Sequence, residues 1–428
     1  RTYIMEKRLG FHYFQDFDHY RMSDLELWVP ELASLKTSWL ALKAPATVAI
    51  PEEFITRLIQ AGIQPILHFD FQVNSSVRTE DLRVLLSSYA RWGVKHVIFF
   101  DRPNTKAAWT DGSWSQGDLV ERFLDRYLPF VRLAEQNGLV PVFPPLEPGG
   151  DYWDLSFLKK VLQLVRQRRS FDFSANFHMA VSSQTFDHSL DWGKGGPSHW
   201  KTPRPYAKVE LGEENHIGFN TWQWYSELVN EVLNVTPKFF LFYYGMARLA
   251  NDKMDTENSF EQMVDIALSL SEDSKQATSL PECVLGCCFW LLSASESDPH
   301  GKTSYFDASG NPKAAGIPAC KQKIEASSKQ KMEYAVSSRL AEWIYPIDHY
   351  LLLPSYDWGI PENTLDRIRP IIRDARPTIG FSVIEATNAR KVTVWNENGA
   401  FSEHDLQLLR EAGCIVEEQL VNSIGITV

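Results

Sequence analysis

Short apolar segments alternate with amphipathic stretches of helical length through most of this chain, and this alternation limits the folds open to it. The apolar segments do not alternate internally with polar residues, which is typical of strands buried on both faces of a parallel sheet. We expect eight strands, at residues 8–15, 38–45, 64–71, 95–100, 139–148, 173–181, 237–245 and 283–294. Helices are expected to follow them at residues 23–35, 51–62, 79–92, 117–137, 155–168, 220–233, 260–270 and 312–323. Eight regular strand–helix units favour closure into a (β/α)8 TIM barrel over an open, doubly wound sheet.

A polar segment at residues 321–333 leads from this region into a smaller α/β unit. We expect residues 1–325 to form the barrel and residues 326–428 to form a small Rossmann-like or flavodoxin-like domain. One of its helices begins at Ser402 and ends at Gly413, residue types that cap helices. The unit has no G-x-G-x-x-G motif, so no nucleotide is expected. We expect it to pack on the barrel or to join subunits of a homo-oligomer.

Charge and apolar content exclude several kinds of partner. The net charge is −11 and the only short basic run lies at residues 166–170, so no nucleic-acid ligand is expected. The most apolar run, at residues 284–294, is too short to span a membrane, so no membrane partner is expected either.

Cysteine usage indicates a reducing compartment. The chain has five cysteines, an odd number, and three of them lie in or beside the apolar run at residues 284–294. Buried, reduced thiols in a cytoplasmic protein are the expected outcome, although a chain that begins at Arg1 leaves export open. The neighbours Cys287 and Cys288 have no second cysteine pair at zinc spacing, so neither a metal nor another cofactor is expected.

A site in such a barrel lies at the carboxyl ends of the strands. The segment KHVIFFDRPN illustrates the pattern, because an apolar run ends there in Asp101, Arg102 and Asn104. Reading the other strand ends in the same way gives His12, His68, Asp70, Glu147, His178, Tyr243, Tyr244 and Trp290, and the loops add Trp109 and Trp192. Any one of these side chains alone is more often structural, and Asp70 with Arg102 fits a buried ion pair. Together they form a polar and aromatic set that suits a hydroxyl-rich ligand, because polar groups bind hydroxyls and rings stack on sugar faces.

Four segments resemble the retaining (β/α)8 glycoside hydrolases, the cellulase-like and xylosidase-like barrels, from about residue 10 to residue 321. The DRPN segment is similar to the family's Asn-Glu-Pro-Asn, and NFHMAV at residues 176–181 is similar to the segment of its strand-six histidine. PKFFLFYYG at residues 237–245 resembles the strand that ends in the family's Glu-x-Gly. The pair GCCFWLL and SYFDASGNPKAAG resembles the strand-eight tryptophan and the segment that follows it. This resemblance implies a barrel that acts on carbohydrate.

The chain departs from that family at both catalytic positions. The resemblance places the acid/base glutamate where Arg102 stands, and the nucleophilic glutamate where strand seven ends in Tyr243 and Tyr244. Arginine cannot donate a proton at working pH, because its pKa is above about 12. Both carboxylates of the retaining mechanism are therefore missing from their usual places.

Two functions remain open, and the first expectation is hydrolysis of a glycosidic bond by non-standard residues. Glu147 would then be the acid and Asp70 or Asp101 the base or nucleophile, with Tyr244 tuning it. A tyrosine nucleophile is a variant of this idea, and Arg102 would then bind the carboxylate of an acidic sugar. The alternative is a non-hydrolytic, carbohydrate-binding barrel, in which Asp101 and Arg102 form an ion pair or a ligand clamp. A metal-dependent hydrolase is weaker, because only His12 is available on the first strand.

Overall fold

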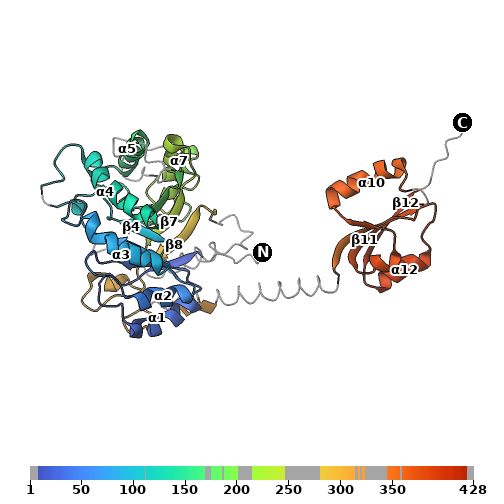
Figure 1. Ribbon diagram of the computed structural model, residues 1–428, viewed down its shortest axis with the longest axis horizontal. Coiled ribbons are helices and arrows are strands. Elements are labelled where there is room, and N and C mark those ends of the chain that lie inside the picture. The colour runs from blue at the N-terminus through green and yellow to red at the C-terminus, as the bar shows by residue number, and fades with distance from the viewer. Residues whose placement is uncertain are drawn as a thin grey trace. The chain divides into compact units, whose positions relative to one another are not determined.

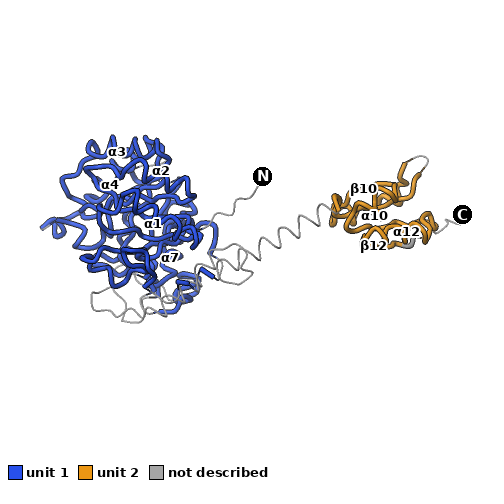
Figure 2. Tube along the Cα trace, turned by 90° about the horizontal axis from the view of Figure 1, so that it is seen from below, with its two compact units in different colours: residues 1–325 blue, residues 326–428 orange. Residues whose placement is uncertain are grey.

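The computed structural model describes residues 8–110, 112–168, 175–185, 188–200, 215–245, 280–313, 317–318, 321–322, 345–356 and 359–421. The chain divides into two compact units, residues 1–325 and residues 326–428 (Figure 2). Each unit is described by itself below. The helix expected at residues 260–270 and most of the polar segment at residues 321–333 lie outside the described residues.

The first unit is a closed barrel of eight parallel strands, which confirms the predicted fold (Figure 1). Each strand pairs with the next along the chain, and the last closes on the first, with Gly10 opposite Cys288. The strands are β1 (Leu9–His12), β2 (Trp39–Lys43), β3 (Gln64–Phe69), β4 (His96–Phe99), β5 (Val140–Phe143), β6 (His178–Ser182), β7 (Lys238–Tyr244) and β8 (Val284–Phe289).

Helices surround the barrel and cover its strands. They are α1 (Met22–Ser34), α2 (Glu52–Gln60), α3 (Thr79–Arg91), α4 (Leu119–Gln136), α5 (Asp154–Gln167) and α7 (Thr221–Leu233). Short 3-10 turns lie at η1 (Lys106–Ala108), η2 (Gly196–Ser198) and η3 (Pro299–Thr303). No described helix is both long and apolar enough to cross a bilayer.

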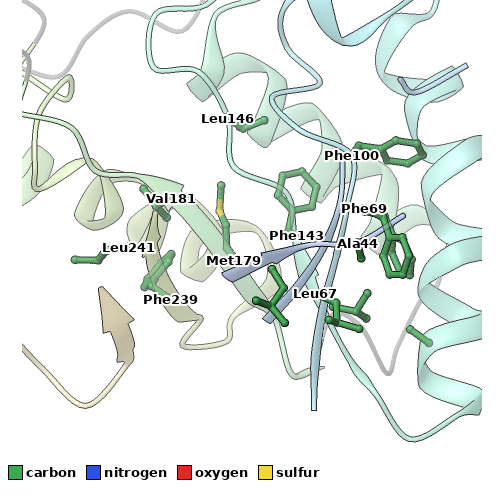
Figure 3. Close-up of a cluster of buried hydrophobic side chains, with 14 of the residues drawn as sticks. Ala44, Leu67, Phe69, Phe100, Phe143, Leu146, Met179, Val181, Phe239 and Leu241 are labelled. Atoms are coloured by element: carbon green, nitrogen blue, oxygen red, sulfur yellow. The ribbon is translucent and has the colours of Figure 1, made fainter. Parts of the chain in front are cut away.

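Alternating strand residues build two apolar layers. One set fills the inside of the barrel and includes Ile66, Ile98, Val142, Ala180 and Phe240. Their neighbours along the strands point outwards and pack under the helices; Figure 3 shows this outer layer with Leu67, Phe69, Phe143, Met179 and Leu241. Inner and outer sets are what a two-residue side-chain period produces when both faces of a sheet are covered. The barrel is therefore a packed core, and a ligand can enter only at its ends.

The second unit is a four-stranded parallel sheet in the order β10-β9-β11-β12, so the predicted C-terminal α/β domain is confirmed. Its strands are β9 (Ile347–Leu352), β10 (Thr378–Gly380), β11 (Ala389–Glu397) and β12 (Ile415–Val421), and its helices are α10 (Glu362–Ala375), α11 (Val383–Ala386) and α12 (Glu403–Glu411). Separate apolar clusters form around Tyr350 and Leu352 and around Leu351 and Leu353, so both faces of the sheet are covered. Ser402 caps α12 as expected, since its hydroxyl accepts the N–H of Asp405.

Candidate functional site

The loop after β4 turns sharply and places Asp101 and Arg102 at the mouth of the barrel. Phe100 and Arg102 both have positive φ, 68° and 41°, a left-handed conformation that costs energy in residues with side chains. As a result Phe99 and Phe100 both pack in the outer layer, and the Asp101 carboxylate reaches the barrel mouth. The Nε of Arg102 donates to Oδ2 of Asp101 at 2.8 Å. Strain of this kind gathers at functional sites, so the turn marks a candidate site.

The end of β7 carries a similar irregularity, and it decides which tyrosine belongs to the site. Tyr243 has a φ of 57° and lies where the β7–β8 register shifts. Phe242 and Tyr243 therefore both join the cluster inside the barrel, while Tyr244 packs in the outer layer against Phe289. The hydroxyl of Tyr243 donates to Oδ1 of Asp101 at 2.8 Å. Tyr243 thus takes the place at the mouth that we expected of Tyr244.

Glu147, after β5, approaches the same arginine. Its Oε2 lies 3.7 Å from Nη1 of Arg102, and the Arg102 guanidinium lies 5.3 Å from the Tyr243 ring centroid. Burial alone would lower the pKa of Arg102, but the charges of Asp101 and Glu147 raise it above its ordinary value. Burial, followed by the charge of Asp101, raises the pKa of Tyr243 well above its ordinary value. At neutral pH the site therefore holds a cationic guanidinium and a protonated phenol.

A layer of rings closes the barrel beneath these groups. The imidazole of His12 stacks on Tyr243, with centroids 4.8 Å apart, and its Nε2 accepts the Tyr243 N–H at 3.3 Å. Burial, and secondarily His68, lowers the pKa of His12 well below its usual value, so His12 is neutral with its proton on Nδ1. The indole of Trp290 contacts both rings, with its centroid 5.4 Å from that of Tyr243 and 5.1 Å from that of His12. These three side chains are buried, so they form the floor of the site.

The mouth continues over β2 and β3 through a second ion pair. Nζ of Lys43, the last residue of β2, lies 3.2 Å from Oδ2 of Asp70. The charge of Asp70 also raises the pKa of Tyr243. The Lys43–Asp70 pair and the Asp101 centre, which consists of Asp101, Arg102 and Tyr243, therefore share one electrostatic environment. Lys43 is missing from the set predicted from sequence, although the strand-end rule applied to residues 38–45 would have found it.

Two predicted ligand residues are engaged with the backbone. His68 bonds through Nε2 to the carbonyl oxygen of Phe100 at 2.9 Å, which ties β3 to the strained turn. Asn104 is fully buried and bridges the loops after β4 and β5. Its Nδ2 donates to the carbonyls of Glu147 and Tyr152, and its Oδ1 accepts the N–H of Glu147. Asn104 therefore positions Glu147.

The contacts recorded for three other predicted residues are not with Asp101, Arg102, Tyr243 or Glu147. His178 is the first residue of β6 and packs near His96, the first residue of β4, so its predicted place at a carboxyl strand end is wrong. The reason is that β6 continues to Ser182 before it reaches the mouth. Trp109 is buried in the outer layer, where its Nε1 donates to the carbonyl of Pro103. Trp192 lies in the loop after β6 and stacks on His188.

The mouth carries one more carboxylate than cation. Three carboxylates, those of Asp70, Asp101 and Glu147, face two cations, Lys43 and Arg102. Among the described residues no group of three or more histidine, cysteine, aspartate or glutamate side chains has an arrangement that could hold a metal ion. The arrangement offers hydrogen-bond donors and acceptors above an aromatic floor.

No protein-family model matches this chain, and a comparison with curated proteins gives no match. Among solved structures, the chain is similar to a glucosidase from Croceicoccus marinus, with 13% identity over 74% of this chain and 67% of that chain and a TM-score of 0.48. It is similar to a monomeric beta-xylosidase from Caulobacter crescentus, with 12% identity over 74% and 68% of the two chains and a TM-score of 0.49. A third similarity is to a GH128 endo-beta-1,3-glucanase from Sorangium cellulosum, with 12% identity over 74% and 97% and a TM-score of 0.41. The structural neighbours are thus glycoside hydrolases, but at these values the chemistry rests on this chain's own residues.

Proposed function

We propose that the barrel binds a neutral carbohydrate at the carboxyl ends of its strands and does not hydrolyse it. The observation that carries this proposal is the network of Arg102, Asp101 and Tyr243, which joins the ends of β4 and β7. The sequence resemblance puts the two catalytic glutamates of the family at these strand ends. An arginine and a tyrosine occupy them here, and both are bonded to Asp101. Binding is therefore preferred to the hydrolysis that we expected first.

The network lacks the two functions that a retaining hydrolase needs, a proton donor and an attacking carboxylate. Arg102 remains a cation at any working pH. The hydroxyl of Tyr243 donates a hydrogen bond to Asp101 and has a pKa well above neutral, so Tyr243 is a poor nucleophile. Asp101 accepts hydrogen bonds from both neighbours, so it has no proton to give while those bonds persist.

The same groups suit hydroxyls better than a charged ligand. Arg102 and Asp101 have side chains that are 30% and 18% exposed, and that of Glu147 is 20% exposed, so all three can reach a ligand. Arg102 already faces two carboxylates, and a uronic acid would have to compete with them. Carboxylates outnumber cations at the mouth, which disfavours a further anion. Hydroxyls can accept from Arg102 and donate to Glu147 without this cost.

Glu147 supports the competing function, hydrolysis by relocated residues. It is a partly exposed carboxylate that faces Arg102 and stands outside the Asp101–Tyr243 hydrogen bond. A general acid must carry a proton, and a neighbouring permanent cation works against that. We therefore assign Glu147 to ligand binding and keep its catalytic role as the outcome that would overturn the proposal.

A glycan panel with neutral and uronic oligosaccharides tests both functions on the full chain. Mass spectrometry reports new products, and isothermal titration reports binding. We expect no products, binding of a neutral glycan, and a loss of affinity of about tenfold or more in Arg102→Ala, in line with the loss of a charge-assisted hydrogen bond. Arg78→Ala, which removes an exposed arginine paired with Asp81 at the start of α3, is the matched control and should bind like the wild type.

Products that disappear in Glu147→Gln would establish a hydrolase and overturn the proposal. Absence of both products and binding across the panel would overturn it as well. Circular dichroism separates a binding defect of Arg102→Ala from misfolding, and Arg102→Lys, which keeps a cation, should lose less affinity.

A further inference from the structure

An exposed aromatic ring stands at the mouth beyond the centre described above. Phe17, in the loop after β1, is 49% exposed. The other exposed large apolar side chains of the described part of the barrel are Val48 and Val84, so Phe17 is the one aromatic among them. A single exposed apolar residue is ordinary on a protein surface, so its surroundings decide whether it has a role.

The loop that carries Phe17 is held by its own contacts. Oδ1 of Asp16 accepts the N–H of Asp18 and bonds to Nδ1 of His19. The His19 ring stacks on Phe14, with centroids 3.8 Å apart, and the hydroxyl of Tyr13 donates to the His19 carbonyl. The backbone on both sides of Phe17 is thus fixed. A ligand that contacts the ring does not have to order this loop first.

Two charged side chains, Lys43 and Asp70, connect the ring of Phe17 to Tyr243 and Asp101 through successive interactions. Nζ of Lys43 lies 5.4 Å from the Phe17 ring centroid and pairs with Asp70, whose side chain is 34% exposed. Asp70 in turn acts electrostatically on Tyr243, which is bonded to Asp101. Phe17, Lys43, Asp70 and the Asp101 centre therefore follow one another across the ends of β1, β2, β3 and β4.

We infer that Phe17 is a stacking platform for a second sugar unit, so that the ligand is a neutral oligosaccharide rather than a monosaccharide. This inference rests on the proposed function. A pyranose whose hydroxyls are equatorial has an apolar C–H face that packs on an aromatic ring, while the hydroxyls around its edge remain free to bond. Lys43 supplies a donor and Asp70 an acceptor for those hydroxyls. One unit then lies over Arg102 and Glu147, and a further unit lies over Phe17.

The test measures affinity against ligand length. The probes are gluco-, xylo-, manno- and galacto-configured neutral saccharides of one to four units, titrated into the full chain and into Phe17→Ala. We expect affinity to rise with length in at least one series and Phe17→Ala to lower affinity for the longer members about tenfold. Affinity for the single unit should be unchanged. Phe17→Trp should preserve the rise, and Val84→Ala, an equally simple surface truncation on α3, should have no effect.

The outcomes separate the two proposals. Affinity that does not depend on length, or a Phe17→Ala variant that binds the longer members as the wild type does, would overturn the inference and leave the proposed function standing. If none of the saccharides binds the wild type, the proposed function fails and the inference fails with it.

Discussion

Asp154 is a fully buried carboxylate that joins three segments of the barrel unit. It accepts the N–H of Gly149 at 2.8 Å and the hydroxyl of Tyr225 at 2.6 Å, and its Oδ1 lies 3.2 Å from Nε2 of His216. Burial alone would raise the pKa of Asp154, but His216, Tyr225 and the Gly149 N–H lower it below its ordinary value. A carboxyl group whose pKa is lower in the folded state than in the unfolded state stabilises the fold at pH values above its unfolded pKa. This stabilisation is lost as the pH falls through its folded pKa.

We therefore predict a pH-dependent penalty for Asp154→Asn. At pH 7 the variant should lose about 3–5 kcal/mol of unfolding free energy, because His216 and Tyr225 lose a buried charged partner. The difference from the wild type should shrink below about pH 4, where the unfolded carboxyl takes up a proton. Urea unfolding at a series of pH values measures it. Asp125→Asn, whose aspartate is exposed, should cost less than about 1 kcal/mol, and a pH-independent difference for Asp154→Asn would contradict the assignment.

Tyr243 offers a prediction at the site itself. Tyr243→Phe keeps the ring stacked on His12 and removes the hydrogen bond to Asp101. We expect a loss of about 1–3 kcal/mol of unfolding free energy, typical of a removed bond to a charged partner. Glycan affinity should change by less than Arg102→Ala changes it, because the phenol faces Asp101. Titration of both variants with the same saccharide checks this order, and a larger loss in Tyr243→Phe would make the phenol a ligand contact.

At the scale of elements, the loops after β4 and β5 act as one unit through Asn104. Asn104→Ala should leave the N–H and carbonyl of Glu147 and the carbonyl of Tyr152 without this partner, at a cost of about 2–3 kcal/mol. Because Glu147 loses its support, glycan affinity should fall as well. Asn137→Ala removes the hydrogen bond from the Asn137 side-chain amide to the carbonyl of Leu133 at the end of α4, and it is the matched control. It should lower the free energy of unfolding slightly and leave glycan affinity unchanged. Denaturant unfolding and calorimetric titration measure the two effects, and unchanged affinity in Asn104→Ala would remove Glu147 from the ligand site.

The elements also show which parts of the site the sequence could predict. Apolar runs located the eight strands, and the parallel arrangement brought His12, Asp101 and Glu147 to one end of the barrel. The choice between Tyr243 and Tyr244 could not be predicted, because regular alternation from Phe240 would turn Tyr244 inwards and the left-handed residue at Tyr243 reverses this.

His178 and Trp109 show a different limit of sequence-based prediction. The sequence does not distinguish a side chain buried at the start of a strand from one buried at its end or beneath a loop. An apolar run gives no sign of where strand pairing starts, so the sequence pattern predicts the wrong end of β6 for His178. An indole in a loop can stack on a ligand or fill the layer beneath, and Trp109 fills the layer.

At the scale of the whole molecule, the two units have separate cores. The clusters inside and around the barrel contain residues of the first unit, and the clusters on both faces of the second sheet contain residues of the second. Of the eight exposed large apolar side chains among the described residues, five lie in the smaller unit: Ile379, Phe381, Ile384, Leu408 and Ile415. Among the described residues, the exposed apolar side chains are therefore concentrated on the C-terminal unit, on or beside its two edge strands β10 and β12 and its helices α11 and α12.

We predict that a fragment ending at Lys329 folds and works without the C-terminal unit. It should be a soluble monomer, should unfold in one cooperative transition, and should bind the glycan of the full chain with the same affinity, because every residue of the proposed site lies in the barrel. Light scattering after size exclusion measures the mass, and the full chain should be heavier than one copy if its C-terminal unit joins subunits. An insoluble fragment would instead mean that the C-terminal unit covers apolar surface of the barrel within the same chain. A full chain that is already monomeric, beside a soluble fragment, would rule out the homo-oligomer and leave the smaller unit's exposed apolar side chains to a different partner.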